Sequence, residues 1–492
     1  MKQVFNPYLP LYECIPDGEP HVFGDRVYIY GSHESEGSDR FCNLDYVTYS
    51  APVDDLKSWR YEGVIYRAKQ DPLYDKYPYM FAPDVVRGND GKYYLYYSLS
   101  NIFPDCSYAI SVAVCDTPSG KFEFLGYVKN PDGSILRDFM VFDPGLINDN
   151  GTIRLYYGQW WDYFEDERLN YEEAVNRTML LLRKTREEVI NSEGGAMGSM
   201  GAVTVELCDD MMTVKTKPKH ILKLPYKTSD FAGHEFFEAS SMRKIGERYY
   251  FIYSTRRGHE LAYATSNFPD RDFKYGGVIV SNGDIGFNER KEEDRVNRTG
   301  NNHGSIENIN GEWYIFYHRQ THKNEFSRQA CAEKIKIGED GSIKQVEMTS
   351  CGLNAGPLKA QGTYPSVICC NLSNNHMPHC DATNERLPNI TNKGDERYIE
   401  TVEDGTFFAF KYFDFENVSK IGISYRSGDI APEGEMLIKT SFGDTVCGKI
   451  KITPKKEWTS AYTEIRIENG VYPLIFEYRG QGSLDVKEIH FS

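Results

Sequence analysis

No apolar run in the sequence approaches the roughly 20 residues that a helix needs to span a bilayer. The N-terminal stretch, MKQVFNPYLPLYECIPDGEP, also lacks the hydrophobic segment of a secretory signal, so we expect a cytoplasmic protein with no membrane partner. Positive charge is in the minority, because 56 Lys and Arg face 72 Asp and Glu and leave a net charge of −16. An acidic chain without a basic cluster argues against nucleic acid and favours a neutral ligand.

Several motifs of nucleophilic and metal chemistry are absent as well. The sequence has no G-x-S-x-G elbow and no glycine-rich phosphate loop, and no thiol has a histidine partner in a recognisable pattern. The 11 cysteines lack metal-ligand spacing, and the Cys369-Cys370 pair has no second cluster that would complete a zinc site. We therefore expect free thiols in a reducing compartment, and no hydrolysis by a serine or cysteine nucleophile.

Aromatic residues are abundant and recur in one pattern. The chain has 36 Tyr and 27 Phe, which favour strands and can stack on the apolar faces of sugars. A turn glycine followed by an aromatic strand occurs five times, as GDRVYIYGS from Gly24, GKYYLYYSLS from Gly91, GTIRLYYG from Gly151, GERYYFIYST from Gly246 and GEWYIFYHR from Gly311. Self-similarity at this spacing is typical of a propeller or solenoid.

We predict an all-β protein with two domains. Four short strands per repeat, five times over, indicate a five-bladed β-propeller over residues 1–358, with a single large sandwich as the alternative. Around residue 371 the aromatic pattern stops and Asn, Thr, Pro and Gly dominate, which predicts a linker over residues 359–380. Short alternating strands then predict a β-sandwich of the jelly-roll type over residues 381–492.

An ionisable residue precedes every turn glycine at nearly the same distance. These residues are Asp17 and Asp84, seven positions before their glycines, and Asp143, Glu238 and His303, eight positions before theirs. The innermost strand of each blade runs along the propeller axis, so we expect the five side chains to meet at one mouth. Any one of them alone could be ordinary turn chemistry, but their shared offset favours a functional ring.

Clustered carboxyl groups suit the cleavage of glycosidic bonds. Like charges at close range raise one another's pKa, so one group can stay protonated near neutral pH while another remains a charged base. The acid then protonates the leaving oxygen and the base activates a water. A separation of roughly 6.5–9.5 Å between the two carboxyls leads to inversion, and about 5–5.5 Å to retention.

These motifs resemble glycoside hydrolase family 43, inverting enzymes on a five-bladed propeller that act on arabinofuranosyl, xylosyl and related linkages. The resemblance covers all five blades. It implies that Asp17 is the general base, that Glu238 is the general acid, and that Asp143, in FDP, tunes the pKa of the acid and positions it. His303, in NNHGS, matches the axial histidine, which in relatives lies near a central water or calcium ion.

The sequence departs from the family pattern at two places. Asp17 is followed by Gly18 where the family usually has proline, and Glu238 opens EAS where the family usually has EGP. Glu19 and Glu235 are therefore rival assignments for the two roles. The resemblance requires no cofactor and allows a structural Ca²⁺ on the axis near His303.

Further residues are candidates for binding an oligosaccharide. The resemblance suggests Phe81 and Asp84, in FAPD, and Arg319, in YHR; Arg328, in FSRQA, could also reach the pocket. Trp160 or Trp161, in GQWWDYF, could wall a sugar subsite, whereas His21 fits the flank of the inner strand better than a catalytic role. Packing within a blade or a surface ion pair is the alternative for each of these side chains.

The C-terminal run GVYPLIFEYRGQGSLDVKEIHF resembles the closing strands of a family 6 carbohydrate-binding module, with Trp458 and Tyr412 as candidate sugar platforms and a purely structural domain as the alternative. The whole pattern favours an inverting α-L-arabinofuranosidase or β-xylosidase. The alternatives are a catalytically silent carbohydrate-binding propeller and a related propeller glycosidase of different specificity, such as a galactosidase.

Overall fold

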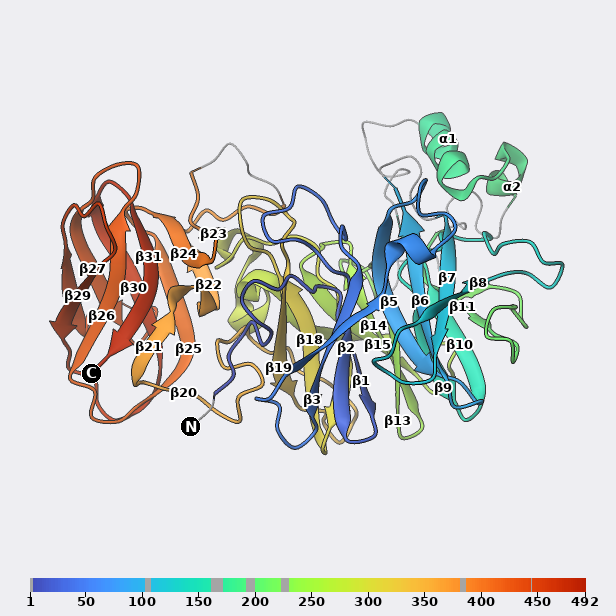
Figure 1. Ribbon diagram of the computed structural model, residues 1–492, viewed down its shortest axis with the longest axis horizontal. Coiled ribbons are helices and arrows are strands. Elements are labelled where there is room, and N and C mark those ends of the chain that lie inside the picture. Colours follow the sequence, from blue (N-terminus) through green and yellow to red (C-terminus); the bar gives the residue numbers. More distant parts are fainter. Residues whose placement is uncertain are drawn as a thin grey trace.

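The computed structural model describes residues 3–101, 108–160, 171–191, 200–222, 230–380, 386–443 and 445–492. Figure 1 shows two bodies side by side, a larger one in blue to yellow-green and a smaller one of orange and red strands. The described part contains two α-helices, α1 (Tyr171–Leu182) and α2 (Arg186–Ile190), which lie together at one edge of the larger body. No helix among these residues is long and apolar enough to cross a membrane.

The larger body consists of five antiparallel sheets, each of which follows chain order from the axis outward. The first four sheets have four strands each, and the fifth has three. Their strands are β1 (Glu19–Phe23), β2 (Arg26–Tyr30), β3 (Tyr46–Pro52) and β4 (Arg60–Tyr66); β5 (Tyr79–Arg87), β6 (Tyr93–Ser100), β7 (Ala109–Cys115) and β8 (Glu123–Tyr127); β9 (Gly145–Asp149), β10 (Thr152–Tyr157), β11 (Val203–Glu206) and β12 (Lys219–His220); β13 (Phe236–Ile245), β14 (Arg248–Thr255), β15 (Glu260–Ser266) and β16 (Lys274–Ser281); and β17 (Ile306–Ile309), β18 (Glu312–Arg319) and β19 (Gln329–Ile335).

The first strands of the five sheets form a closed ring. β9 contacts β5 and β13, and β1 contacts β5 and β17. The hydroxyl groups of Ser241 and Ser305, 2.7 Å apart, link the fourth sheet to the fifth. A parallel bridge between Gly18 and Gly304 links the fifth sheet to the first. The predicted five-bladed propeller is therefore confirmed.

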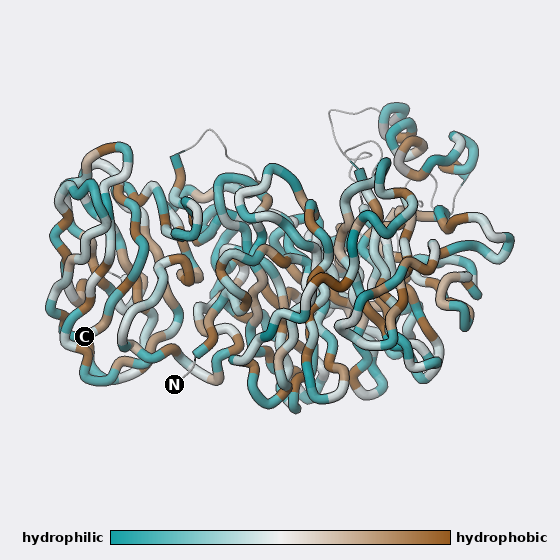
Figure 2. The backbone as a smooth tube through the Cα atoms, in the orientation of Figure 1, coloured by the Kyte–Doolittle hydropathy of each residue, from teal (hydrophilic) through white to brown (hydrophobic). Residues whose placement is uncertain are grey.

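The recurring aromatic pattern forms the second strand of every blade. All five turn glycines have positive φ, from 60° at Gly246 to 92° at Gly151, a conformation that glycine adopts without strain. Tyr96 packs in a core shared by the second and third blades, whereas its neighbour Tyr97 packs in a core shared by the first and second. Because a strand between two neighbours has two buried faces, the copies read as aromatic runs and not as strict alternation. Figure 2 shows hydrophobic segments running through the interior of this body.

The three strands of the fifth blade are completed by the N-terminal segment. The side chain of Asn6 exchanges hydrogen bonds with the backbone of Ala332 in β19, both at 3.0 Å, and the Tyr8 amide donates to the carbonyl of Ala330. Residues near the start of the chain thus lie along the edge strand of the last blade.

The smaller body is a sandwich of two six-stranded sheets around one large core. One sheet contains β20 (Leu358–Lys359), β22 (Asn371–Ser373), β25 (Phe407–Phe415), β27 (Glu433–Lys439), β28 (Gly448–Ile452) and β30 (Gly470–Gln481). The other contains β21 (Gly362–Pro365), β23 (Asn389–Lys393), β24 (Glu396–Val402), β26 (Lys420–Ser427), β29 (Thr459–Glu464) and β31 (Leu484–Phe491). The sandwich agrees with the predicted fold class.

Residues 359–380 differ from the linker that the sequence suggests. β21 pairs with β31 and β22 pairs with β25, so this segment belongs to both sheets of the sandwich. Tyr364 and Leu372 are buried in the sandwich core, which fixes the segment against it. At the junction with the propeller, Lys411 forms buried ion pairs with Asp284 and Glu347, at 2.7 and 2.9 Å. The described cysteines are free thiols.

Candidate active site

Four of the five ionisable residues expected at the axis line one cavity of about 440 Å³. The lining includes Asp17, Asp143, Glu238 and His303, together with Phe81 and Arg328 from the predicted binding residues. Asp17, Asp143 and His303 stand just before β1, β9 and β17, while Phe81 and Glu238 belong to β5 and β13. Every blade therefore contributes a side chain to the same mouth of the propeller.

Unusual backbone conformations turn the carboxyl groups toward this cavity. Asp17, Asp143 and Ala239 have positive φ values of 58°, 44° and 67°, and the pairing of β13 with β14 shifts on both sides of Glu238. Left-handed conformations cost of order 1–3 kcal/mol each for residues other than glycine and tend to cluster at functional sites. Ala239 stands where the family usually has glycine, and it keeps the left-handed conformation that glycine would adopt readily.

Asp17 is held as a carboxylate. Its two oxygens accept hydrogen bonds from Arg328, at 2.8 Å from Nη1 and 3.2 Å from Nη2, and His318 Nδ1 lies 3.3 Å from Oδ1. Burial raises the pKa of Asp17, but the Arg328 guanidinium together with His318 and His303 outweighs burial and holds that pKa well below its usual range. Asp17 is therefore ionised and available as a base.

Glu238 has the opposite protonation preference. Burial raises its pKa to about 7, the hydrogen bond from Gln159 Nε2 at 2.7 Å opposes this rise, and the charge of Asp17 adds to it. Burial and the neighbouring charges of Glu238 and Asp17 also raise the pKa of Asp143, whose Oδ2 accepts the Ala239 amide proton at 3.1 Å. The coupled carboxyls thus retain a proton near neutral pH that an exposed glutamate would have lost.

His303 lies between two of these carboxyl groups. Its Nδ1 is 3.9 Å from Asp17 Oδ1 and 3.5 Å from Asp143 Oδ2. Burial lowers its pKa to about 4 against the opposing charge of Asp17, so the imidazole is neutral near pH 7. Calcium takes six to eight oxygen ligands, and the two carboxylates beside His303 already bind Arg328 and the Ala239 amide. A calcium ion beside His303 would therefore need water molecules for most of its ligands.

Asp84 does not reach the cavity. It is buried and accepts hydrogen bonds from the amides of Val85 and Leu146, and its Oδ1 lies 2.6 Å from His21 Nε2. The cause is the longer turn of the second blade: Arg87 pairs with Tyr93 and leaves residues 88–92 in the turn, whereas in the first blade only residues 24–25 separate the strands. A residue seven positions before Gly91 therefore lies too far along β5 to reach the cavity. Phe81 occupies the position on this strand that lines it.

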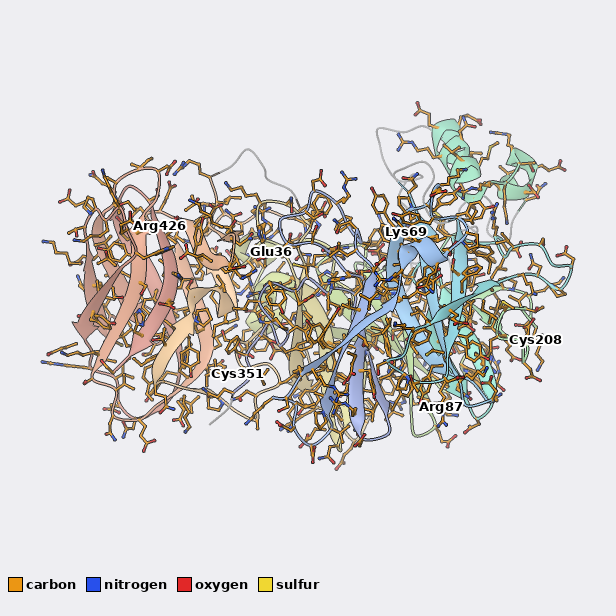
Figure 3. The ribbon with its side chains drawn as sticks, viewed as in Figure 1. Glu36, Lys69, Arg87, Cys208, Cys351 and Arg426 are labelled. Carbon is orange, nitrogen blue, oxygen red and sulfur yellow. The ribbon has the colours of Figure 1, made fainter. Side chains whose placement is uncertain are left out.

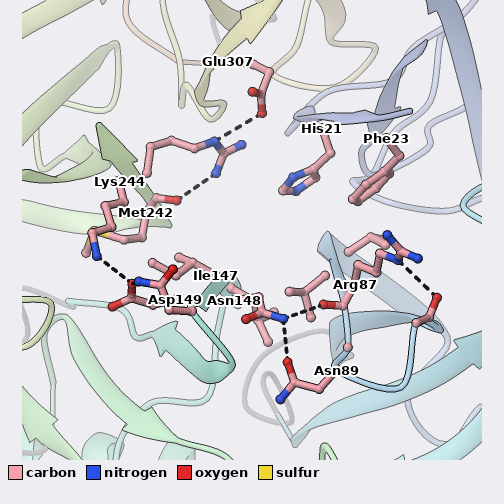
Figure 4. Close-up of a pocket in the computed structure, with 17 residues that line it drawn as sticks. His21, Phe23, Arg87, Asn89, Ile147, Asn148, Asp149, Met242, Lys244 and Glu307 are labelled. Atoms are coloured by element: carbon pink, nitrogen blue, oxygen red, sulfur yellow. Dashed lines mark hydrogen bonds and ion pairs between the residues drawn. The ribbon is translucent and has the colours of Figure 1, made fainter. Parts of the chain in front are cut away.

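Asp84 instead joins a polar cluster near the opposite end of the axis. There a second cavity of about 670 Å³ opens beside the hairpin turns, lined by His21, Arg243 and Glu307 among others (Figure 4). Glu19, one rival for the general base, is buried and paired with Arg243 at 3.0 Å. Among the described residues, Glu19, His21 and Asp84 are the group whose ligand atoms lie close enough to share a metal ion, and His303 is not part of it.

Three other sequence candidates lie outside the catalytic cavity. Arg319 donates hydrogen bonds to the carbonyls of Val367 and Cys369, at 2.7 Å each, and so fastens the propeller to the sandwich. Trp160 is buried in a hydrophobic core of the fourth blade region, where it packs instead of walling a sugar subsite. Trp161 lies outside the described residues. Glu235, the rival for the acid, caps the amide of Gly233 and does not line the cavity.

Several lining residues were not anticipated from the sequence. They are Phe41, Ser100, Asn101, Phe142, Gln159, Phe237, Asn301 and Glu325. Phe142 and Phe237 stand directly before Asp143 and Glu238, so an aromatic residue followed by an acid was a usable signal in these two blades. Phe41 and Glu325 lie on long loops, where the sequence carries no such pattern.

A deeply buried carboxylate with a depressed pKa and a carboxylic acid with a raised pKa line the same aromatic cavity. That pairing supplies the base and the acid for breaking a glycosidic bond. The fold and this site define a propeller glycoside hydrolase. The model of the glycosyl hydrolases family 43 matches residues 20–197 and 188–343, and the chain belongs to this family. Asp143, Glu238 and His303 lie within the matched range, and Asp17 lies just before it.

Individual relatives agree with this assignment. A xylosidase/arabinosidase of Thermoclostridium stercorarium is 46% identical over 504 residues, which cover 99% of this chain and 98% of that protein. A xylosidase/arabinosidase of Bacteroides ovatus is 29% identical over 326 residues, covering 63% of this chain and 87% of that protein. A GH43_1 enzyme from Xanthomonas citri, solved in complex with xylose, shares the fold with a TM-score of 0.51 at 22% identity, covering 72% of this chain and 95% of that one.

Proposed function

We propose that the protein removes arabinofuranosyl or xylosyl units from oligosaccharides with inversion of configuration. The observation that carries this proposal is the opposed pKa shift of two buried carboxyl groups in one cavity, downward for Asp17 and upward, to about 7, for Glu238. The names of the two relatives, both xylosidase/arabinosidases, support the sugar class.

In the proposed reaction, Asp17 takes a proton from a water as that water attacks the anomeric carbon. Arg328 keeps Asp17 ionised and fixes its orientation through two hydrogen bonds. Glu238 gives its proton to the glycosidic oxygen as the bond to the leaving group breaks. Burial and the charge of Asp17 keep Glu238 protonated until this step. Asp143 takes the role of pKa modulator, because its carboxyl group interacts electrostatically with that of Glu238. Exchange of one proton each with solvent then restores both groups.

The aromatic walls suit a sugar ring. Phe41, Phe81, Phe142 and Phe237 all line the cavity, and their faces can pack against the apolar C–H surfaces of a pentose. Asn101 and Asn301 provide amide groups for sugar hydroxyls at the same site.

Time-resolved proton NMR of the products tests the stereochemistry. With an α-linked arabinofuranoside we expect the β-anomer to appear first, and the α-anomer would contradict inversion. Asp17→Asn and Glu238→Gln should each lower kcat by about 10²–10⁴-fold on an unactivated disaccharide. An aryl glycoside with a good leaving group should rescue Glu238→Gln and not Asp17→Asn. Near-normal turnover of the disaccharide by either variant would exclude the assigned role.

A further inference from the structure

The two aromatic residues of the sandwich that could have been sugar platforms are already engaged. The guanidinium of Arg426 covers the ring of Trp458 at 4.4 Å, and the indole Nε1 donates to Glu396 at 3.2 Å. The hydroxyl of Tyr412 donates to Glu347 of the propeller at 2.5 Å. The contacts of the sandwich with the propeller therefore suggest a different contribution to the reaction.

Two propeller loops form one rim of the catalytic cavity. The loop between β2 and β3 carries Phe41, and the loop between β18 and β19 carries Glu325 and Arg328. The loops are fastened to each other, because the Gly37 amide donates to Ser327 Oγ at 2.8 Å and Asn324 Nδ2 donates to the Ser38 carbonyl at 3.0 Å. The rings of Phe41 and Phe326 also pack edge to face at 4.6 Å.

The β23–β24 hairpin of the sandwich holds both loops from outside. Arg397, in β24, binds Glu36 of the first loop in a bidentate ion pair, with Nε–Oε1 at 3.0 Å and Nη2–Oε2 at 2.6 Å. Both side chains are largely buried, at 15% and 12% exposed. In the second loop, the His322 amide donates to the Ile390 carbonyl at 2.7 Å, and His322 Nε2 lies 3.0 Å from Asn392 Oδ1. Figure 3 places Glu36 near the boundary between the two bodies.

The held segment leads directly to the general base. Glu34, two positions before Glu36, is fully buried and accepts hydrogen bonds from Arg328 Nε at 3.0 Å and Nη2 at 2.6 Å. The same guanidinium holds both oxygens of Asp17. A shift of the Glu36 segment would thus be passed through Glu34 to Arg328 and Asp17. Displacements near 1 Å can cost up to about 10²-fold in rate.

We propose that the β23–β24 hairpin is a positioning element of the active site, with Arg397 as its positioning residue. The sandwich acts in sugar hydrolysis by fixing the two rim loops, and this role rests on the proposed glycosidase function. A bidentate, largely buried ion pair suits the task, because its fork geometry fixes orientation as well as distance. In this proposal, the contacts with the sandwich determine where the two rim loops lie relative to the cavity.

Arg397→Met in the full chain tests this role, with Lys439→Met as the matched control. Lys439 pairs with Glu477 inside the sandwich at 2.6 Å, with exposures of 13% and 12%, and does not contact the rim loops. We expect Arg397→Met to lower kcat/KM on an arabinofuranosyl or xylosyl disaccharide by about five- to tenfold relative to Lys439→Met, with similar melting temperatures. The reversed pair Glu36→Arg/Arg397→Glu should recover part of the loss.

Amide hydrogen exchange separates this proposal from the proposed function, because it needs no turnover. Residues 33–42 and 321–328 should exchange at least about threefold faster in Arg397→Met than in Lys439→Met. Unchanged exchange would overturn the bracing, even if the wild-type protein hydrolysed no glycoside. Faster exchange with unchanged kcat/KM would overturn the positioning role, and so would a loss of activity that merely follows a lower melting temperature.

Discussion

Gln159 tunes the proton affinity of the acid, and replacing it should move the alkaline limb of the pH profile. Its Nε2 donates to Glu238 Oε2 at 2.7 Å and favours the ionised carboxylate, while burial favours the protonated form. Gln159→Met keeps the length of the side chain and removes the donor. The pKa of Glu238 should then rise above its present value of about 7.

The magnitude follows from the energy of that hydrogen bond. A hydrogen bond to a charged group contributes about 1.5–3 kcal/mol, and about 1.4 kcal/mol corresponds to one pKa unit. The protonated acid retains part of the contact with Gln159, so we expect a rise of about one unit. Only the protonated enzyme can deliver the proton. Activity should therefore persist to a pH about one unit higher in the variant, and fall as pH rises through the new pKa.

The assay is kcat/KM against pH on an unactivated disaccharide, for which protonation of the leaving group limits the rate. An aryl glycoside with a good leaving group serves as the control, since its alkaline limb should be shallow in both proteins. Glu238→Gln should lack the limb altogether. An alkaline limb that stays in place or moves to lower pH in Gln159→Met would refute the assignment of Glu238 as a general acid whose pKa is lowered by Gln159.

Three further substitutions separate structural roles from catalytic ones. Asp84→Asn should destabilise the fold by about 3–5 kcal/mol, because it removes the buried carboxylate that contacts His21. Calorimetry should show a lower melting temperature, and a kcat reduced more than twofold in the folded enzyme would contradict this. Trp160→Ala should lower the free energy of unfolding by about 3–5 kcal/mol, because it leaves a cavity in the core. A raised KM without a loss of stability would instead indicate that Trp160 contacts the sugar. Arg319→Leu leaves two carbonyls at the junction without their hydrogen-bond donor, at a cost of about 1–3 kcal/mol each. The midpoint of urea unfolding should therefore shift to lower concentration. An unchanged midpoint would show that Arg319 does not stabilise the junction.

The repeating parts of this molecule could be predicted from sequence, and the parts that depend on loop length could not. Five turn glycines with aromatic strands predicted the propeller, and the carboxyls just before β1 and β9 and near the start of β13 predicted the catalytic cavity. The prediction for Asp84 was wrong because it assumed turns of equal length in all blades. The longer turn of residues 88–92 moves Asp84 along its strand and away from the cavity. Phe41 and Glu325 could not be predicted, because the loops that bring them to the cavity are held by contacts with sandwich residues that are distant in sequence.

The edge strand of the last blade imposes an order on the biosynthesis of the protein. Asn6 and Tyr8 leave the ribosome before the propeller strands, and their partners in β19 lie 326 and 322 positions later in the chain. The segment around Asn6 and Tyr8 must therefore stay unpaired until nearly the whole propeller has been synthesised. If another chain bound this segment in that interval, the edge of β19 would be left unpaired, and unpaired edges recruit further strands.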